Sequence, residues 1–183
     1  RDKTPDELKS QIPLLEEFSA TLGVTFLEKD NYEADDIIGT LATQAAAAGY
    51  DASVVTGDRD ALQLVRPNLR VLMTKKGISD LKEYDEAAFM EEYQMEPLKL
   101  IDLKGLMGDT ADNIPGVPGV GPKTATKLLL EYGTLENVLD HAGEVKGKKL
   151  QERLTTFAEQ ARLSKTLATI NCSVPDLDAP GAY

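Results

Sequence analysis

Eight residues near the middle of the chain constrain its fold more than any other stretch. The segment PGVPGVGP, residues 115–122, contains six residues that are glycine or proline, so neither a helix nor a strand can run through it. Pro122 favours the start of a helix, and the glycines let the backbone approach a ligand closely. The sequence therefore predicts a hairpin followed by a helix whose first N–H groups can bind phosphate.

Strands and helices alternate before this hairpin. We expect strands at residues 24–27, 51–57 and 69–73, and helices at 4–23 and 33–49, with a short helix at 58–65. Thr4 is the expected N-cap of the first helix, and Pro13 is a candidate interruption within it. This alternation is typical of an α/β fold with a parallel sheet.

Only helical patterns follow residue 84. Candidate helices cover residues 85–94, 97–108, 121–133, 135–143 and 147–170. No long linker divides the chain, so we expect two closely packed subdomains. Residues 1–83 form the predicted α/β core, and residues 84–183 form the predicted all-α subdomain.

Composition limits the classes of protein to which the chain can belong. Its 183 residues are 42% hydrophobic, which is enough for a sizeable core. Cys172 is the single cysteine, so an internal disulfide is excluded; with no apolar run near the roughly 20 residues that cross a membrane, we expect a cytoplasmic protein. The formal net charge of −11 argues against general affinity for nucleic acid. A DNA partner would need bound cations or a local basic face.

Two groups of carboxylates follow neighbouring predicted strands. YEADD, with Glu33, Asp35 and Asp36, opens a helix after the first strand, and TGDRD, with Asp58 and Asp60, follows the second. Each group alone is compatible with an ordinary acidic helix start or a capped turn. Both lie beyond the carboxyl ends of strands, however, where open α/β sheets bind ligands. Converging carboxylates repel one another, so the two groups together predict a cation site.

A third acidic pair precedes the hairpin. Asp109 and Asp112 in GDTADN are spaced i, i+3, which would put both on one side of a helical turn. Carboxylate oxygens without histidine or cysteine partners suit Mg²⁺ or Mn²⁺. Two such ions can clamp a phosphodiester for hydrolysis.

Basic residues follow the hairpin. Lys123 and Lys127 lie one helical turn apart and add an attraction for phosphate that does not depend on base sequence. A rigid connection between helices that binds no ligand is the alternative interpretation. The later basic run VKGKKLQER, residues 145–153, fits either a phosphate-binding surface or a solvated helix face.

These segments together resemble a known family. YEADD, TGDRDALQLV and GLMGDTADNIPGVPGVGPKTATKLL are similar to the 5′-nuclease (5′-3′ exonuclease) domain at the N-terminus of bacterial DNA polymerase I, which is related to the flap endonucleases. The resemblance implies a PIN-like α/β core followed by a helix-hairpin-helix subdomain that grips duplex DNA through its backbone. It also implies two divalent metal ions and, at the hairpin, a monovalent cation, typically K⁺.

The resemblance also assigns residues. The implied metal and catalytic carboxylates are Glu33, Asp35, Asp36, Asp58, Asp60, Asp109 and Asp112. The implied DNA-binding residues are Gly116, Val117, Gly119, Val120, Gly121, Lys123, Thr124 and Lys127.

The chain departs from the family at its start. In the family, a strand with a further metal-binding aspartate and a basic helical arch precede the part that resembles Arg1 onward. Because that strand supplies one side of the metal cage, we expect these 183 residues alone to lack appreciable nuclease activity.

The resulting hypothesis is a metal-dependent, structure-specific 5′-nuclease. It would hydrolyse 5′ flaps and RNA primers on duplex DNA during replication and repair, with a polymerase domain in the same chain as a candidate partner. The first alternative is a noncatalytic helix-hairpin-helix module that binds DNA for a polymerase. The second, a PIN-like ribonuclease, is disfavoured because the hairpin suits duplex DNA better than single-stranded RNA.

Overall fold

The first helix is broken near its middle. The computed structural model, which describes residues 5–75, 77 and 79–177, has α1 at Asp6–Lys9 and α2 at Ile12–Thr21. The prediction of one continuous helix is therefore wrong, and its expected N-cap, Thr4, lies outside the described residues. Pro13 lies in the first turn of α2, where it is tolerated. In a continuous helix its ring would clash with the carbonyl of Lys9, so α1 ends there.

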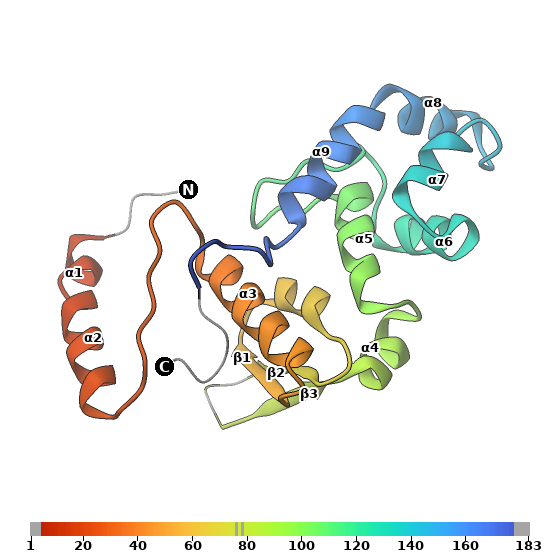
Figure 1. The fold of residues 1–183 in the computed structure, drawn as a ribbon. Helices are drawn as coiled ribbons and strands as arrows, with labels where there is room; N and C mark the ends of the chain where they lie inside the picture. Colours follow the sequence, from red (N-terminus) through yellow and green to blue (C-terminus); the bar gives the residue numbers. More distant parts are fainter. Residues whose placement is uncertain (1–4, 76, 78, 178–183) are drawn as a thin grey trace.

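The strand predicted at residues 24–27 does not form. This segment runs as an extended connection between α2 and α3 (Figure 1), with Val24 57% exposed and Phe26 37% exposed. A strand requires a neighbour that takes up its N–H and C=O groups. The sheet in the described part of the chain has the order β1-β2-β3 and does not include this segment.

The central α/β unit follows the predicted alternation. It consists of α3 (Ala34–Ala47), β1 (Ala52–Thr56), the 3₁₀ helix η1 (Arg59–Leu64) and β2 (Leu69–Thr74). Strands β1 and β2 pair in parallel, with Val54 opposite Val71, as the sequence predicts. Both valines are buried, which fixes the register of the pair because a shift of one residue would turn them to solvent.

An edge strand was missed by the sequence analysis. Strand β3 (Leu81–Tyr84) pairs antiparallel with β2 and places Tyr84 opposite Val71. Tyr84 is the only residue of β3 that is buried, so the strand lacks the alternation of apolar residues that would have identified it.

The second half is helical, as predicted. It contains α4 (Glu86–Tyr93), the 3₁₀ helix η2 (Pro97–Lys99), α5 (Leu100–Met107), α6 (Pro122–Tyr132), α7 (Leu135–Asp140), α8 (Lys148–Thr156) and α9 (Ala158–Ala168). The helix expected at 147–170 is two helices, because the chain bends at Phe157. Thr155 and Thr156 just before the bend are β-branched, and such residues stiffen and weaken a helix end. No described helix is long and apolar enough to cross a membrane.

Helix α5 joins the two halves (Figure 1). It packs against η1 in the α/β half and against α6, α7 and α9 in the helical half. Leu103 and Leu106 of α5 are buried in one continuous hydrophobic cluster that extends from Val54 in the sheet to Ala161 in α9. The position of η1 relative to the helical half is therefore set by the packing of α5.

The segment after α9 returns to the α/β half and crosses α3 (Figure 1). The amide of Gln63 binds the carbonyl of Ala168 at 3.0 Å, and the N–H of Val174 donates to Thr40 Oγ1 at 3.0 Å. Asn171 N–H donates to Asp36 Oδ1 at 2.9 Å. These bonds bring the end of the described chain beside the first turn of α3.

A carboxylate on α4 ties η1 to the edge of the sheet. Glu92 accepts hydrogen bonds from Arg59, Lys82 and Tyr84, each at 2.6 Å. These bonds lower the pKa of Glu92 from 4.5 to about 2; the bond from Lys82 contributes most, and the bond from Tyr84 contributes next. Arg59 also binds the Tyr93 hydroxyl. We call Glu92 and its three donors Arg59, Lys82 and Tyr84 the Glu92 clamp. It fixes Arg59, which lies between Asp58 and Asp60.

The Glu92 clamp predicts a dependence of stability on pH. A depressed carboxyl pKa stabilises the fold above pH 4.5, and this contribution is lost as the pH falls toward 2. Because the Glu92 side chain is 35% exposed, solvent screening limits the effect, and Glu92→Gln should lower the free energy of unfolding at pH 7 by about 1 kcal/mol. Urea unfolding at several pH values measures it.

The difference between Glu92→Gln and the parent should shrink below pH 4.5 and vanish near pH 2. Glu91→Gln, which removes the same charge from the adjacent exposed residue, is the control and should cost less. A difference that stays constant from pH 7 to pH 2.5 would refute the role of the Glu92 charge.

Candidate metal centre and nucleic-acid interface

One cavity gathers six of the seven predicted carboxylates. Its volume is about 450 Å³, and its acidic lining comprises Glu33, Asp35, Asp36, Asp58, Asp60 and Asp112. The segment 166–171, at the end of α9, forms much of the remaining wall. No local motif marks this segment as part of the site, because only the return of the chain across α3 (Figure 1) brings it there.

Asp109 lies on the other side of the same acidic wall. It lines a second cavity of about 550 Å³ together with Asp58, Asp60 and Asp112. Those three residues therefore separate two cavities and face both. The third predicted pair, Asp109 and Asp112, is thus joined to the two groups from the α/β half.

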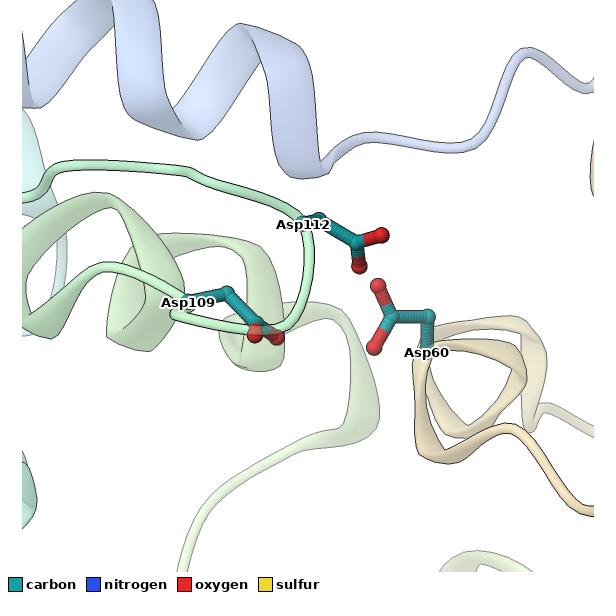
Figure 2. A group of neighbouring side chains, drawn as sticks. All are labelled: Asp60, Asp109 and Asp112. Atoms are coloured by element: carbon teal, nitrogen blue, oxygen red, sulfur yellow. The ribbon is translucent and has the colours of Figure 1, made fainter. Parts of the chain in front are cut away.

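Asp60, Asp109 and Asp112 form a close cluster (Figure 2). One carboxylate oxygen from each lies within 4.8 Å of the others. Asp60 comes from η1, and the other two come from the loop after α5. This donor set contains only carboxylate oxygens, so it fits a hard divalent cation such as Mg²⁺ or Mn²⁺.

The loop that carries Asp109 and Asp112 is not the helical turn that the spacing predicts. Asp109 and Ile114 exchange two backbone hydrogen bonds of 2.8 Å, which close a tight loop. Asp109 Oδ1 accepts from the N–H of Ala111 at 2.9 Å inside that loop. The two aspartates still converge, because the closed loop turns both toward η1 (Figure 2).

Asp58 organises the start of η1. Its Oδ1 accepts from the N–H of Asp60 at 2.9 Å, and its own N–H donates to Thr56 Oγ1 at the end of β1. This cap explains why DRD begins a helical turn directly after the strand. It also fixes the two carboxylates beside each other at the carboxyl end of β1.

Asp35 and Asp60 show the electrostatic cost of this arrangement. Burial raises the pKa of Asp35, and the neighbouring charges of Asp58 and Glu33 raise it further. Burial also raises the pKa of Asp60, although Lys104 opposes the shift. A bound cation would remove this repulsion, because it favours the ionised form of each carboxylate.

Asp36 already has two backbone partners. One oxygen accepts from Glu33 N–H at 3.2 Å, and the other accepts from Asn171 N–H at 2.9 Å. These bonds fix the first turn of α3 against the segment after α9. Its predicted role as a metal ligand stays a prediction, and the structure gives it this additional positioning role.

Lys104 is a site residue that the sequence analysis missed. Its ammonium binds Asp60 Oδ1 and, at 2.7 Å, Asp109 Oδ2, and the residue is 5% exposed. Burial alone would lower the pKa of Lys104, but the bonds to Asp109 and Asp60 outweigh it and raise the pKa. The same contact lowers the pKa of Asp109. The signal in the sequence was a lone lysine inside the apolar run LIDLKGLMG.

The hairpin is anchored to α9 and to the end of α5. Gly116 N–H donates to Ser164 Oγ at 3.0 Å, and the Gln160 side chain donates to the Gly116 carbonyl at 2.7 Å. Val117 and Val120 are buried at 1% and 3% exposure. Their side chains are core anchors, so the hairpin offers a ligand mainly its backbone and its exposed residues.

Beyond the hairpin, α6 presents its N-terminus to solvent. Gly121 is the N-cap, Pro122 is in the first turn, and no acidic residue occupies that turn. Lys123 and Lys127 are both exposed, whereas Ala125 and Leu128 are buried on the opposite face. Arg153 of α8 reaches the same surface, with a guanidinium nitrogen 3.5 Å from the carbonyl oxygen of Gly119.

The fold and site define a class of two-part proteins, in which an acid-lined cavity on an α/β unit adjoins a helical half with a glycine–proline hairpin. Two models of one protein family match the chain. Residues 1–94 match a model described as "5'-3' exonuclease, N-terminal resolvase-like domain", and residues 95–180 match "5'-3' exonuclease, C-terminal SAM fold". The chain belongs to the 5′-3′ exonuclease family.

A curated relative agrees with this membership, and solved structures share the fold. The chain is 51% identical over 175 residues to DNA polymerase I of Bacillus caldotenax; the match covers 96% of this chain and 20% of the relative, so the chain spans about a fifth of that protein. A T5 5′-exonuclease mutant has the same fold, with a TM-score of 0.75 and 22% identity over 90% of this chain and 65% of its own.

A bacteriophage T5 flap endonuclease, solved as a pseudo-enzyme-product complex with DNA and metal ions, also shares the fold. It has a TM-score of 0.72 and 21% identity over 92% of this chain and 63% of its own.

The close approach of Gly116 to Gly108 predicts that position 116 tolerates only glycine. Gly116 has φ +57°, and an added Cβ would lie 2.2 Å from the backbone nitrogen of Gly108. Gly116→Ala must therefore move the backbone that closes the Asp109–Asp112 loop. We expect a loss of about 3 kcal/mol in the free energy of unfolding, which is a fall of about 6 to 12 °C in Tm.

Gly133→Ala is the matched control for Gly116→Ala. Gly133 also has a left-handed backbone, with φ +83°, but no atom lies within 4 Å of an added Cβ. It should cost only about 1 kcal/mol. Equal losses in the two variants, measured by thermal unfolding, would show that backbone conformation alone, and not the contact with Gly108, decides the cost.

Proposed function

We propose that this chain provides the nuclease centre and the duplex-binding surface of a metal-dependent 5′-nuclease, which hydrolyses phosphodiesters at 5′ flaps and primers in DNA. The observation that carries the proposal is the convergence of carboxylates from both halves at one wall, with Asp60, Asp109 and Asp112 within 4.8 Å. The family membership supports the same reaction. Residues 1–83 would supply the α/β core and residues 84–183 the helical subdomain.

The carboxylates would hold two Mg²⁺ or Mn²⁺ ions. When bound, such ions activate a water and stabilise the charge on the leaving oxygen. Asp58, Asp60 and Asp112 face both cavities, and Asp109 lines the second. With Glu33, Asp35 and Asp36 they form the proposed ligand set. Asp36 and Asp58 also position this set, through their bonds to Asn171 and Asp60.

The hairpin and the start of α6 would grip the phosphate backbone of the duplex. Backbone N–H groups at a helix N-terminus attract phosphate, and Lys123 and Lys127 add positive charge that does not read bases. Thr124 and the exposed glycines of the hairpin complete this proposed surface, and Arg153 extends it. K⁺ at the hairpin carbonyls would neutralise further phosphate charge. A local surface of this kind is required because the whole chain carries a net charge of −11.

Two other functions compete with this proposal. A noncatalytic DNA-binding module would need the hairpin but no acidic centre, and a PIN-like ribonuclease would need the acidic centre but not a duplex-binding hairpin. A polymerase domain in the same polypeptide is the proposed partner. Removing metal separates the proposal from the noncatalytic module, because a nuclease loses its activity without metal while DNA binding through the hairpin survives.

Asp58→Asn tests the nuclease centre. In the intact protein that carries this chain, we expect cleavage of a labelled 5′-flap duplex in Mg²⁺ to fall by at least about a hundredfold, because one hard ligand is lost. Asparagine is also a good N-cap, so η1 should remain folded. Duplex affinity should change less than about threefold.

Asp51→Asn is the control for the cleavage experiment. Asp51 is exposed and lies just before β1, at the opposite end of the strand from Asp58, so its removal changes the net charge equally without touching the centre. If Asp58→Asn cleaves within a few-fold of the parent at saturating Mg²⁺, Asp58 is not part of the catalytic site.

Lys123→Ala tests the proposed duplex surface. We expect duplex affinity to fall about equally for different sequences, and the slope of log affinity against log salt to become shallower by about one phosphate contact. Lys9→Ala is the charge-matched control, since Lys9 lies on α1, far from α6 (Figure 1). A slope unchanged by Lys123→Ala would assign the lysine to the fold instead.

A further inference from the structure

Lys104 is a cation built into the fold at the place where the proposed metal would bind. We propose that its ammonium is an exchangeable counterion of the Asp60–Asp109–Asp112 cluster. It holds the cluster together without metal, leaves at least one carboxylate when a divalent ion binds, and thereby weakens metal binding at this cluster. The inference rests on the proposed function, because it concerns the affinity of the same centre.

The contacts of Lys104 place it in direct competition with a metal ion. Its ammonium binds Asp60 Oδ1 and Asp109 Oδ2, which belong to the three residues whose oxygens lie within 4.8 Å of one another. An ion such as Mg²⁺ in this cluster needs carboxylate oxygens at about 2.0 to 2.1 Å. One carboxylate oxygen cannot keep a close ammonium and a close divalent ion on the same side, since the two cations repel each other.

Burial explains why the lysine is needed when metal is absent. The Lys104 side chain is 6% exposed, and those of Asp60 and Asp109 are 16% and 20% exposed. Carboxylates so close together and so little hydrated repel each other strongly. Lys104 supplies the compensating charge from α5, the helix that joins the two halves.

The surroundings give the ammonium room to move. Lys104 lines the 550 Å³ cavity with Asp109 and Tyr93 but does not line the 450 Å³ cavity. Its flexible four-carbon chain can swing the ammonium within the larger cavity, whereas the planar fork of an arginine would be more constrained. A metal can therefore approach the acidic wall from one cavity while the lysine withdraws into the other.

Mn²⁺ binding to the chain tests the exchange directly. Isothermal titration calorimetry would compare the parent with Lys104→Met, which removes the competing charge and keeps the apolar stem. We expect the variant to bind Mn²⁺ about tenfold more tightly. Adding Asp112→Asn to Lys104→Met should abolish this gain, because the gain belongs to the cluster.

Lys99→Met is the control for a general charge effect. It removes the same charge near the start of the same helix, but Lys99 lies 3.9 Å from Asp102, which keeps its closer partner Lys165 at 2.8 Å. Its Mn²⁺ affinity should stay within about twofold of the parent. An equal gain in Lys99→Met and Lys104→Met would overturn the assignment to this contact.

Stability without metal gives a second readout. Lys104→Met should have a lower Tm than the parent in EDTA and a larger rise in Tm on saturation with Mn²⁺. A variant that folds only when Mn²⁺ is present would support the proposal in the same way. An unchanged Tm in EDTA, together with unchanged Mn²⁺ affinity, would overturn it.

A measurement on the unaltered chain avoids dependence on variant folding. Lysine acetylation followed by mass spectrometry should find Lys104 protected in EDTA and modified several-fold faster with Mn²⁺. Equal reactivity in both conditions would overturn the exchange. If neither the parent nor the variants bind Mn²⁺, the proposed metal function is refuted as well. If the parent binds Mn²⁺ and Lys104→Met binds it equally or more weakly, the lysine exchange alone is refuted.

Discussion

The structure depends on holding mutually repelling carboxylates at one wall. Two carboxylate charges within 4.8 Å of each other repel by roughly 3 to 4 kcal/mol at an effective dielectric constant of about 20, and several such pairs would approach the total stability of a domain. Hydrogen-bond donors reduce this repulsion. The N–H of Asp60 donates to Asp58, the N–H of Asn171 donates to Asp36, and the ammonium of Lys104 binds Asp60 and Asp109. Each donor comes from a separately packed element.

This arrangement makes the junction between the halves part of the site. Asp60 is carried by η1, which the Glu92 clamp holds to β3 and α4. Asp109 and Asp112 are carried by the loop after α5, which the close contact of Gly108 and Gly116 folds back on itself. Gly116 in turn is bonded to Ser164 and Gln160 of α9. A shift of α9 would therefore be transmitted through the hairpin to the acidic wall.

Much of this was predictable from the sequence, for identifiable reasons. The alternation of strands with helices identified the strands predicted at residues 51–57 and 69–73, which pair in parallel as β1 and β2. Asp58 and Asp60 follow β1 as expected, whereas Glu33, Asp35 and Asp36 open α3 after a segment that forms no strand. Glycine and proline located the hairpin, and carboxylates without histidine or cysteine indicated a hard cation. The prediction of a strand at residues 24–27 was wrong because this segment has no neighbouring strand with which to pair. Strand β3 was missed because it buries only Tyr84.

Long-range contacts account for what sequence reasoning missed. Nothing local marks the segment after α9 as a wall of the cavity, since its placement depends on hydrogen bonds with Gln63, Thr40 and Asp36 that span more than a hundred residues. Lys104 was hidden for a related reason, because a lysine within an apolar run usually extends its charge to solvent. Here its partner Asp60 is 44 residues away. A buried lysine is costly without such a partner, and Asp60 and Asp109 supply the charge that compensates Lys104 in the folded chain.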